Sequence, residues 1–200
     1  MVFLKICIIL DGVLIDKRQF QYRYGLEFFN NKLRFQNEYS YQFKNMFNCS
    51  NEEEVKFWNK YLTEYYLNAK PEAGARKCIN SLKNDNEIYI IVDRNYLTKK
   101  CVKGYIYKLL LKFWFQRNNI QYDGIIYCDK NNLDEKIKIC EENKFDLVIE
   151  HLIPDIIQLS KTCNVFVYDR PYNQGLSSVD RVYSFYEILN KVEKRGKVKK

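Results

Sequence analysis

The sequence predicts an α/β protein built around a parallel sheet. Short apolar runs recur along the chain, and a helix-like stretch separates each run from the next. Continuous rather than alternating apolarity is typical of strands buried on both faces, and strands that alternate with helices form parallel sheets covered by helices. The length of 200 residues and the hydrophobic content of 46% are sufficient for one buried core.

The predicted strands follow from the apolar runs. They cover residues 3–10, 88–92, 124–128, 146–149 and 165–168, of which 124–128 is the weakest. The predicted helices cover residues 20–33, 51–69, 72–83, 97–118, 133–143 and 154–163. Helix 97–118 has one apolar stripe, which we expect to face the core. Its members are Val102, Tyr105, Ile106, Leu109, Leu110, Phe113 and Trp114.

The stretch between the first strand and Pro71 follows a different pattern. It contains no strong strand, and Ser50 followed by two glutamates at 52 and 53 is typical of a helix N-terminus. We therefore expect residues 17–70 to form a helical cap inserted after the first strand. Residues 1–16 and 71–190 then form the α/β core, and residues 191–200 form a basic, flexible tail.

The cysteines and the single histidine limit the classes of site. The seven cysteines are odd in number and scattered, with no C-x-x-C pair. This pattern argues against a disulfide framework or zinc knuckle and favours reduced thiols in a cytoplasm. His151 is the sole histidine, which leaves little scope for histidine-rich sites. The longest apolar runs are too short to span a bilayer, and no secretory signal is visible.

The formal net charge of +8 comes in part from two segments. Residues 99–117 carry five lysines, one arginine and no acid, and residues 191–200 carry five lysines, one arginine and one glutamate. Basic patches can bind nucleic acid or an anionic membrane. A solvated helix face and a chain terminus explain the same charges more simply.

A carboxylate follows the first predicted strand. The chain continues from Leu10 to Asp11 and Gly12, and the glycine permits a tight turn. Ligands bind at the carboxyl ends of the strands in sheets of this class, so Asp11 is a candidate site residue. An aspartate that only forms the turn explains the same residues.

The segment from Ile9 to Leu14 resembles motif one of the haloacid dehalogenase (HAD) superfamily, D-x-D-G-[TV]-L. More narrowly, residues 5–189 resemble the 5'(3')-deoxyribonucleotidase-like branch that is common in bacteria. The segments that carry this resemblance are residues 24–30, 57–58, 88–91, 113–114 followed by 119–120, 136–140 and 168–173. The resemblance implies a Rossmann-like core, a helical cap, Mg²⁺, and phosphomonoester hydrolysis through an aspartyl-phosphate.

The resemblance implies roles for the residues of motif one, and one of them is substituted. In the family the first aspartate attacks phosphorus and the second is the general acid/base. Asp11 and Gly12 fit the second aspartate and its glycine, which leaves Ile9 at the nucleophile position. An aliphatic side chain has no lone pair to attack phosphorus and no charge to hold Mg²⁺.

Motif two of this branch binds a phosphoryl oxygen through a threonine. The matching residues are Val92, Asp93 and Arg94, which we assign with Gly12 as ligand-binding positions. Val92 lacks the hydroxyl group, and the negative charge of Asp93 weakens anion binding. Asp93 as the N-cap of the following helix is an alternative explanation.

Motifs three and four supply a lysine and an acidic pair in the family. Lys136 is the best match for the lysine, and Lys138 is the second, although a solvated helix lysine explains either residue. The acidic pair corresponds to Glu150 and His151. Because Mg²⁺ prefers oxygen ligands, His151 weakens that site. Asp11, Glu150 and His151 together could instead ligate a softer metal, with a hydrogen-bonded surface histidine as the simpler explanation.

Three hypotheses follow, in order of preference. The first is a catalytically impaired HAD protein that binds a small phosphorylated molecule or a protein partner, because nucleophile, phosphate donor and metal ligand are all altered. The second is an active Mg²⁺-dependent, 5'-nucleotidase-like phosphomonoester hydrolase in which Asp11, Asp16 or Asp93 takes over a role. The third is a basic module for anionic membrane or nucleic acid, which ranks last because the aromatic residues of helix 97–118 are assigned to the core.

Overall fold

The computed structural model describes residues 3–30, 35–37, 39–98, 100–129 and 132–198. Within them, six strands form one sheet in the order β3-β2-β1-β4-β5-β6, and every pairing is parallel. The strands are β1 (Lys5–Ile9), β2 (Glu87–Asp93), β3 (Gly124–Cys128), β4 (Leu147–Glu150), β5 (Asn164–Tyr168) and β6 (Asp180–Val182). The predicted α/β fold with a parallel sheet is confirmed. The short β6 has no apolar run, so the sequence did not predict it.

Strand β1 lies at the centre of the sheet, and this position explains why its sequence is continuously apolar. Ile6 pairs with Ile88 on one side and Leu147 on the other, and Ile8 pairs likewise with Ile90 and Ile149. All of these side chains are buried. Because helices cover both faces, both sets of alternating side chains on the strand must be apolar.

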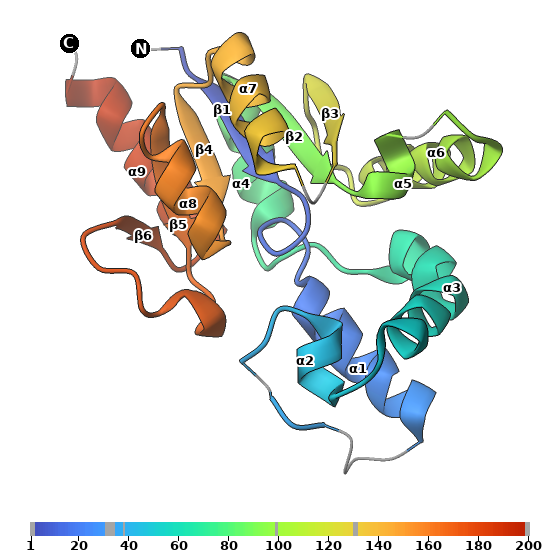
Figure 1. Ribbon diagram of the computed structural model, residues 1–200. Coiled ribbons are helices and arrows are strands. Elements are labelled where there is room, and N and C mark those ends of the chain that lie inside the picture. The colour runs from blue at the N-terminus through green and yellow to red at the C-terminus, as the bar shows by residue number, and fades with distance from the viewer. Residues whose placement is uncertain (1–2, 31–34, 38, 99, 130–131, 199–200) are drawn as a thin grey trace.

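Two pairs of helices cover the sheet (Figure 1). Helices α4 (Ala75–Lys83) and α9 (Phe185–Val198) pack together on one face, and α7 (Leu133–Asn143) and α8 (Ile153–Leu159) pack together on the other. The bounds predicted for α7 are correct to the residue, and α4 and α8 differ from prediction only at their ends. Asn132 and the acids at 134 and 135 explain the precise start of α7, because they cap its N-terminus and suit its dipole.

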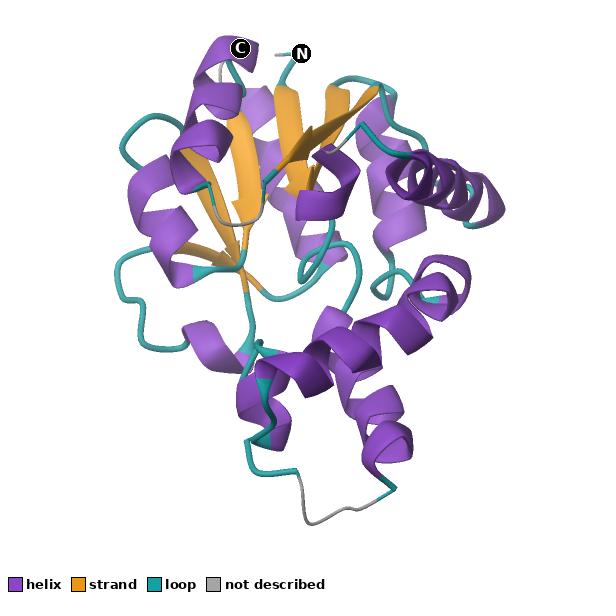
Figure 2. Ribbon diagram, turned by 45° about the vertical axis from the view of Figure 1, so that its right-hand side comes forward, coloured by secondary structure: helices purple, strands orange, loops and turns teal. Residues whose placement is uncertain are grey.

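Three further helices lie together beyond the carboxyl ends of the strands (Figure 2). They are α1 (Lys17–Phe29), α2 (Phe43–Phe47) and α3 (Asn51–Asn68). Asp16 caps α1, and a reciprocal capping box between Ser50 and Glu53 starts α3. Aromatic rings hold the three helices together, as in the stacked pair of Phe43 and Phe57, whose centroids are 3.9 Å apart. The predicted helix 20–33 starts earlier, at Lys17, and residues 31–34 lie outside the described part of the chain.

The prediction for residues 97–118 is wrong in two respects. This stretch forms two helices, α5 (Asn95–Thr98) and α6 (Val102–Arg117), rather than one. Most of the stripe assigned to the core faces solvent instead: Val102, Tyr105, Ile106, Leu109 and Phe113 are exposed. The opposite side of α6 packs inward through Leu111, Trp114 and Phe115. Both sides of the helix are apolar, so periodicity could not decide which one is buried.

The structure also corrects the flexible tail predicted from residue 191. Helix α9 continues through this segment to Val198, and residues 199–200 lie outside the description. Lys191 and Arg195 both bind Asp180, and Val192 is buried against the core. These contacts extend the helix beyond the point where the basic composition indicated disorder. No helix among the described residues has the length and apolarity needed to cross a membrane.

We expect Gly25→Ala to destabilise the protein, although alanine is the better helix former. A Cβ atom at this buried position in α1 would lie 2.2 Å from the ring of Phe47. Overpacking of this kind costs about 1–3 kcal/mol, more than the roughly 1 kcal/mol gained in helix propensity. Urea unfolding measures the change. Gly175→Ala is the matched control, because nothing lies within 4 Å of the added atom there. Equal stability of the two variants would contradict the expected clash.

Candidate functional site

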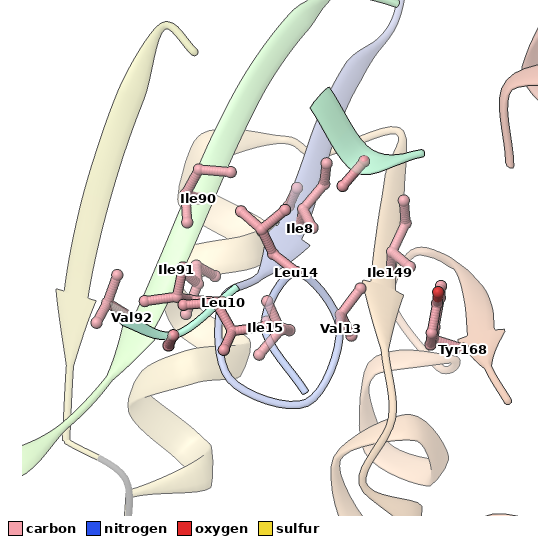
Figure 3. Packing of buried hydrophobic residues seen from close by; sticks show 14 of the residues in the cluster. Ile8, Leu10, Val13, Leu14, Ile15, Ile90, Ile91, Val92, Ile149 and Tyr168 are labelled. Carbon is pink, nitrogen blue, oxygen red and sulfur yellow. The ribbon is translucent and has the colours of Figure 1, made fainter. Parts of the chain in front are cut away.

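A tight turn after β1 fixes the position of Asp11. The amide of Gly12 donates to the carbonyl of Ile15 at 2.8 Å, and the amide of Ile15 donates to Leu10 at 2.9 Å. Gly12 has a φ of 88°, a conformation that favours glycine. Figure 3 shows Leu10, Leu14 and Ile15 clustered in this turn with Ile91 of β2. Apolar side chains of the turn therefore fix it against the sheet, and the turn holds Asp11 at the carboxyl edge of the sheet.

The Asp11 carboxylate is bound by two protein side chains. Arg94 donates from Nε to Oδ2 at 2.8 Å and from Nη2 to Oδ1, and the hydroxyl of Tyr65 in α3 donates to Oδ1 at 2.6 Å. Asp11 is only 2% exposed. Burial raises the pKa of this carboxyl, but the charge and hydrogen bonds of Arg94 outweigh it and hold the pKa below its ordinary value. Asp11 is therefore an anion neutralised by Arg94.

Arg94 is itself enclosed by aromatic rings of α3. Its guanidinium carbon lies 4.9 Å from the ring centroid of Tyr65 and 4.7 Å from that of Tyr66. Both tyrosines belong to α3 and are buried. Since aromatic faces attract a guanidinium, these contacts favour the conformation in which Arg94 points to Asp11. The arginine predicted to bind a ligand is thus directed toward a carboxylate of the protein.

A second charge cluster surrounds Lys136, which lies on α7. Its Nζ donates to Asp93 at 3.0 Å, to Glu150 at 3.3 Å and also to Asp155. Burial lowers the pKa of Lys136, but the three carboxylates outweigh it and raise the pKa well above its ordinary value. Burial and the nearby Glu150 charge raise the pKa of Asp155. The ammonium group of Lys136 thus forms ion pairs with three carboxyl groups. Because Lys136 is buried, the explanation as a solvated helix lysine is wrong for this residue.

His151 is buried rather than at the surface, which corrects the simpler explanation of this residue. Its ring packs so closely on the turn that a Cβ atom at Gly12 would lie 2.3 Å from Nε2. Tyr172 shares a hydrogen bond of 2.8 Å with Nδ1, and the ring centroid of Tyr41 lies 4.8 Å away. Nε2 has no hydrogen-bond partner among the described residues. Burial lowers the pKa of His151 to about 3, so the ring is neutral at pH 7.

Ile9 and Val92 are ordinary core residues in this structure. Both are 0% exposed. Ile9 pairs with Ile91 in the sheet, and Val92 pairs with Tyr127. The positions where the resemblance expects a nucleophile and a phosphate donor therefore lie within the apolar part of the sheet.

The residues at this edge do not fit Mg²⁺. No group of three histidine, cysteine or acidic side chains suited to a metal occurs in the described ranges, so the set Asp11, Glu150 and His151 is not assembled. The carboxylate oxygens already have partners, because Arg94 and Tyr65 occupy Asp11, while the amides of His151 and Leu152 donate to Oε1 of Glu150 at 2.7 and 3.0 Å. Side chains and backbone amides of the protein thus bind the carboxylate oxygens that would otherwise be available to a metal ion.

Several residues of the site escaped prediction. Tyr41 and Tyr65 lie between β1 and Pro71 and carry no motif, so nothing in the sequence pointed to them. Asp155, in the first turn of α8 directly after Pro154, could have been noticed from that position. Arg170 joins distant parts of the chain, since it donates to the carbonyl of Gly12 at 2.8 Å and binds Glu72.

Asp16, a candidate replacement for a catalytic acid, has a structural contact instead. Its side chain accepts a hydrogen bond of 3.0 Å from the amide of Gln19 and so caps α1. Its other oxygen lies 3.5 Å from the guanidinium of Arg170. Asp93, the other candidate, is bound to Lys136 as described above.

Comparison with known proteins supports the fold. No family model matches the sequence, and no curated protein matches it. Solved structures do match. A haloacid dehalogenase-like hydrolase from Streptococcus pneumoniae has a TM-score of 0.64 at 11% identity, over 95% of this chain and 98% of that one. A HAD-superfamily hydrolase of subfamily IA from Geobacter sulfurreducens PCA has a TM-score of 0.60 at 12% identity, over 95% and 96%.

The chain has a HAD-type fold. A third match is the D,D-heptose 1.7-bisphosphate phosphatase from B. bronchiseptica, with a TM-score of 0.54 at 10% identity over 96% of this chain and 99% of that one. That phosphatase was solved in complex with magnesium and phosphate. At such low identity, the HAD fold is what these structures share with this chain.

We expect Arg94→Met to destabilise the protein by about 3–5 kcal/mol, because it leaves the buried Asp11 carboxylate without its cation. Adding Asp11→Asn should recover most of this loss, since the neutral amide can still accept from Tyr65. Urea unfolding of the single and double variants gives the coupling free energy. Independent, additive effects would show that Arg94 and Asp11 do not depend on each other.

We expect His151 to make stability depend on pH. The unfolded ring binds a proton below about pH 6.5, whereas the folded ring does so only below about 3. Between these values the unfolded state holds more protons, so the free energy of unfolding falls as pH falls. The loss between pH 7 and pH 5 is about 2 kcal/mol. His151→Gln should remove this part of the slope. Identical slopes in the two proteins would contradict the neutral, buried ring.

Proposed function

We propose that this protein is a HAD-fold, nucleotidase-like protein that has lost phosphomonoester hydrolysis and acts by binding. The observation that carries the proposal is the state of Asp11. It is the one carboxylate left in the turn motif, and Arg94 and Tyr65 occupy its oxygens. The position two residues earlier, where the resemblance places the nucleophile, holds the buried Ile9.

The chemistry of hydrolysis needs groups that this site does not offer. A nucleophilic carboxylate must present a free oxygen to phosphorus, and Ile9 has none. Asp11 is a poor general base, because Arg94 lowers its pKa and both of its oxygens accept hydrogen bonds. These features support a loss of both steps of the family reaction.

The charge balance of the second cluster also disfavours a phosphate group. Lys136 is the cation shared by Asp93, Glu150 and Asp155, and the neutral His151 adds no positive charge. A phosphate at this edge would meet carboxylates without a free cation among these residues, which is repulsive at short range. Of the two partners expected from the sequence, a phosphorylated ligand is therefore disfavoured at this edge, which leaves a protein partner as the one we propose.

An active hydrolase with a rearranged site is the competing function. Lys136 favours it, because this lysine does reach the acids at the ends of β2 and β4, as the family motif implies. However, an active hydrolase would need a free carboxylate as nucleophile or general base. The two candidates have other partners, since Asp16 caps α1 and Asp93 binds Lys136.

Phosphate release separates the two functions. We expect no turnover of p-nitrophenyl phosphate or of deoxyribonucleoside 3'- and 5'-monophosphates above the protein-free rate, with or without millimolar Mg²⁺. Asp11→Asn, purified in parallel, is the control for contaminating phosphatases and should give the same background. A Mg²⁺-dependent rate that disappears in Asp11→Asn would overturn the proposal and establish the active enzyme.

A further inference from the structure

Helix α6 presents a continuous apolar stripe to solvent. Val102 and Tyr105 are 77% and 65% exposed, and Ile106, Leu109 and Phe113 are each about half exposed. Their spacing of three or four residues places them on one side of the helix. At about 100° per residue they span roughly 100° of its surface. A cluster of large exposed side chains on one helix marks an interaction surface more often than single exposed residues do.

Basic side chains border this stripe on both sides. At the same angular spacing, Lys103 and Arg117 lie along one edge, and Lys108 and Lys112 lie along the other. Lys103, Lys112 and Arg117 are exposed, and Lys108 is half-buried. The helix contains no acidic residue. An exposed apolar face between two rows of cations is the pattern of a helix that lies in the interface of an anionic bilayer.

The opposite side of α6 anchors it to the rest of the protein. The indole of Trp114 donates to the carbonyl of Ala69 at 2.6 Å, and the ring of Tyr107 stacks on Tyr66 with centroids 5.1 Å apart. The helix lies at the periphery of the molecule, beside α3 (Figure 1 and Figure 2). The stripe is therefore an exposed surface on a helix that contacts with the rest of the protein hold in place.

We propose that α6 binds the surface of membranes that contain anionic lipids, with its apolar stripe among the headgroups and its cations on the lipid phosphates and carboxylates. Two features favour lipid over a second copy of the chain. Pairing of two stripes would bring four rows of cations together with no acid from either helix. The net charge of +8 also attracts the chain to an anionic surface. This interaction is independent of catalysis.

The test is co-sedimentation of the full chain with vesicles of phosphatidylcholine and phosphatidylserine, against vesicles of phosphatidylcholine alone. We expect binding to the mixed vesicles only, weakening steeply as salt rises. Lys103→Gln with Lys112→Gln should lower the partition coefficient by about tenfold or more, since each lysine near an anionic surface contributes roughly fivefold. Ile106→Ser with Phe113→Ser should lower it by a similar factor.

Matched variants outside α6 control for general losses of charge and apolarity. Lys138→Gln with Lys161→Gln removes two exposed lysines, and Val55→Ser with Tyr183→Ser removes two exposed apolar side chains. Both should bind as the unchanged protein does. Far-UV circular dichroism and thermal unfolding verify that every variant is folded.

Four outcomes of the vesicle experiment would overturn the proposal. They are no binding at low salt, equal binding to neutral vesicles, full binding by the Ile106/Phe113 variant, and equal losses in the control variants. Sedimentation velocity tests whether two copies of the chain pair through the stripe. Dimers that form as the protein concentration rises, and that the Ile106/Phe113 variant abolishes, would assign the stripe to self-association and overturn the proposal.

Discussion

The ion pair between Asp11 and Arg94 joins the three parts of the chain that meet at the carboxyl edge of the sheet. Asp11 lies in the turn after β1, Arg94 follows β2, and Tyr65 of α3 completes the contact from 54 residues away. Removing both charges from water is expensive, and the two hydrogen bonds from Arg94 together with the one from Tyr65 offset part of this cost. The position of α3 over the sheet is thereby linked to the charge state of one buried carboxylate.

The Lys136 cluster extends this constraint to the other side of β1. It ties α7 to the ends of β2 and β4 through Asp93 and Glu150, and to α8 through Asp155. In the two clusters, side chains of the protein provide the positive charge that the carboxylates require. The charged residues at this edge of the sheet are thus paired with one another, and this pairing is the basis of the proposed loss of hydrolysis.

The parts of the fold that follow from local patterns were predictable. Continuous apolar runs identified five of the six strands described, because a strand that is covered on both faces needs apolar side chains at successive positions. The gathering of Asp11, Arg94 and Glu150 was also predictable, since parallel strands end at one edge, whereas Lys136 of α7 was assigned only through the family resemblance. Their partners were not: Tyr65 carries no motif, and the link from Arg170 to Gly12 spans 158 residues. The side of α6 that is buried depends on tertiary packing, to which periodicity is blind when both sides are apolar.

The burial of residue 9 has a consequence for the evolution of this chain. An acid introduced there would enter the apolar interior of the sheet, where Ile9 is 0% exposed and pairs with Ile91. It would add a buried anion at an edge of the sheet where three carboxylates already share Lys136, and the neutral His151 adds no positive charge. Under the proposed function, an acid at residue 9 alone would therefore not restore hydrolysis, because the surrounding charges would have to change with it.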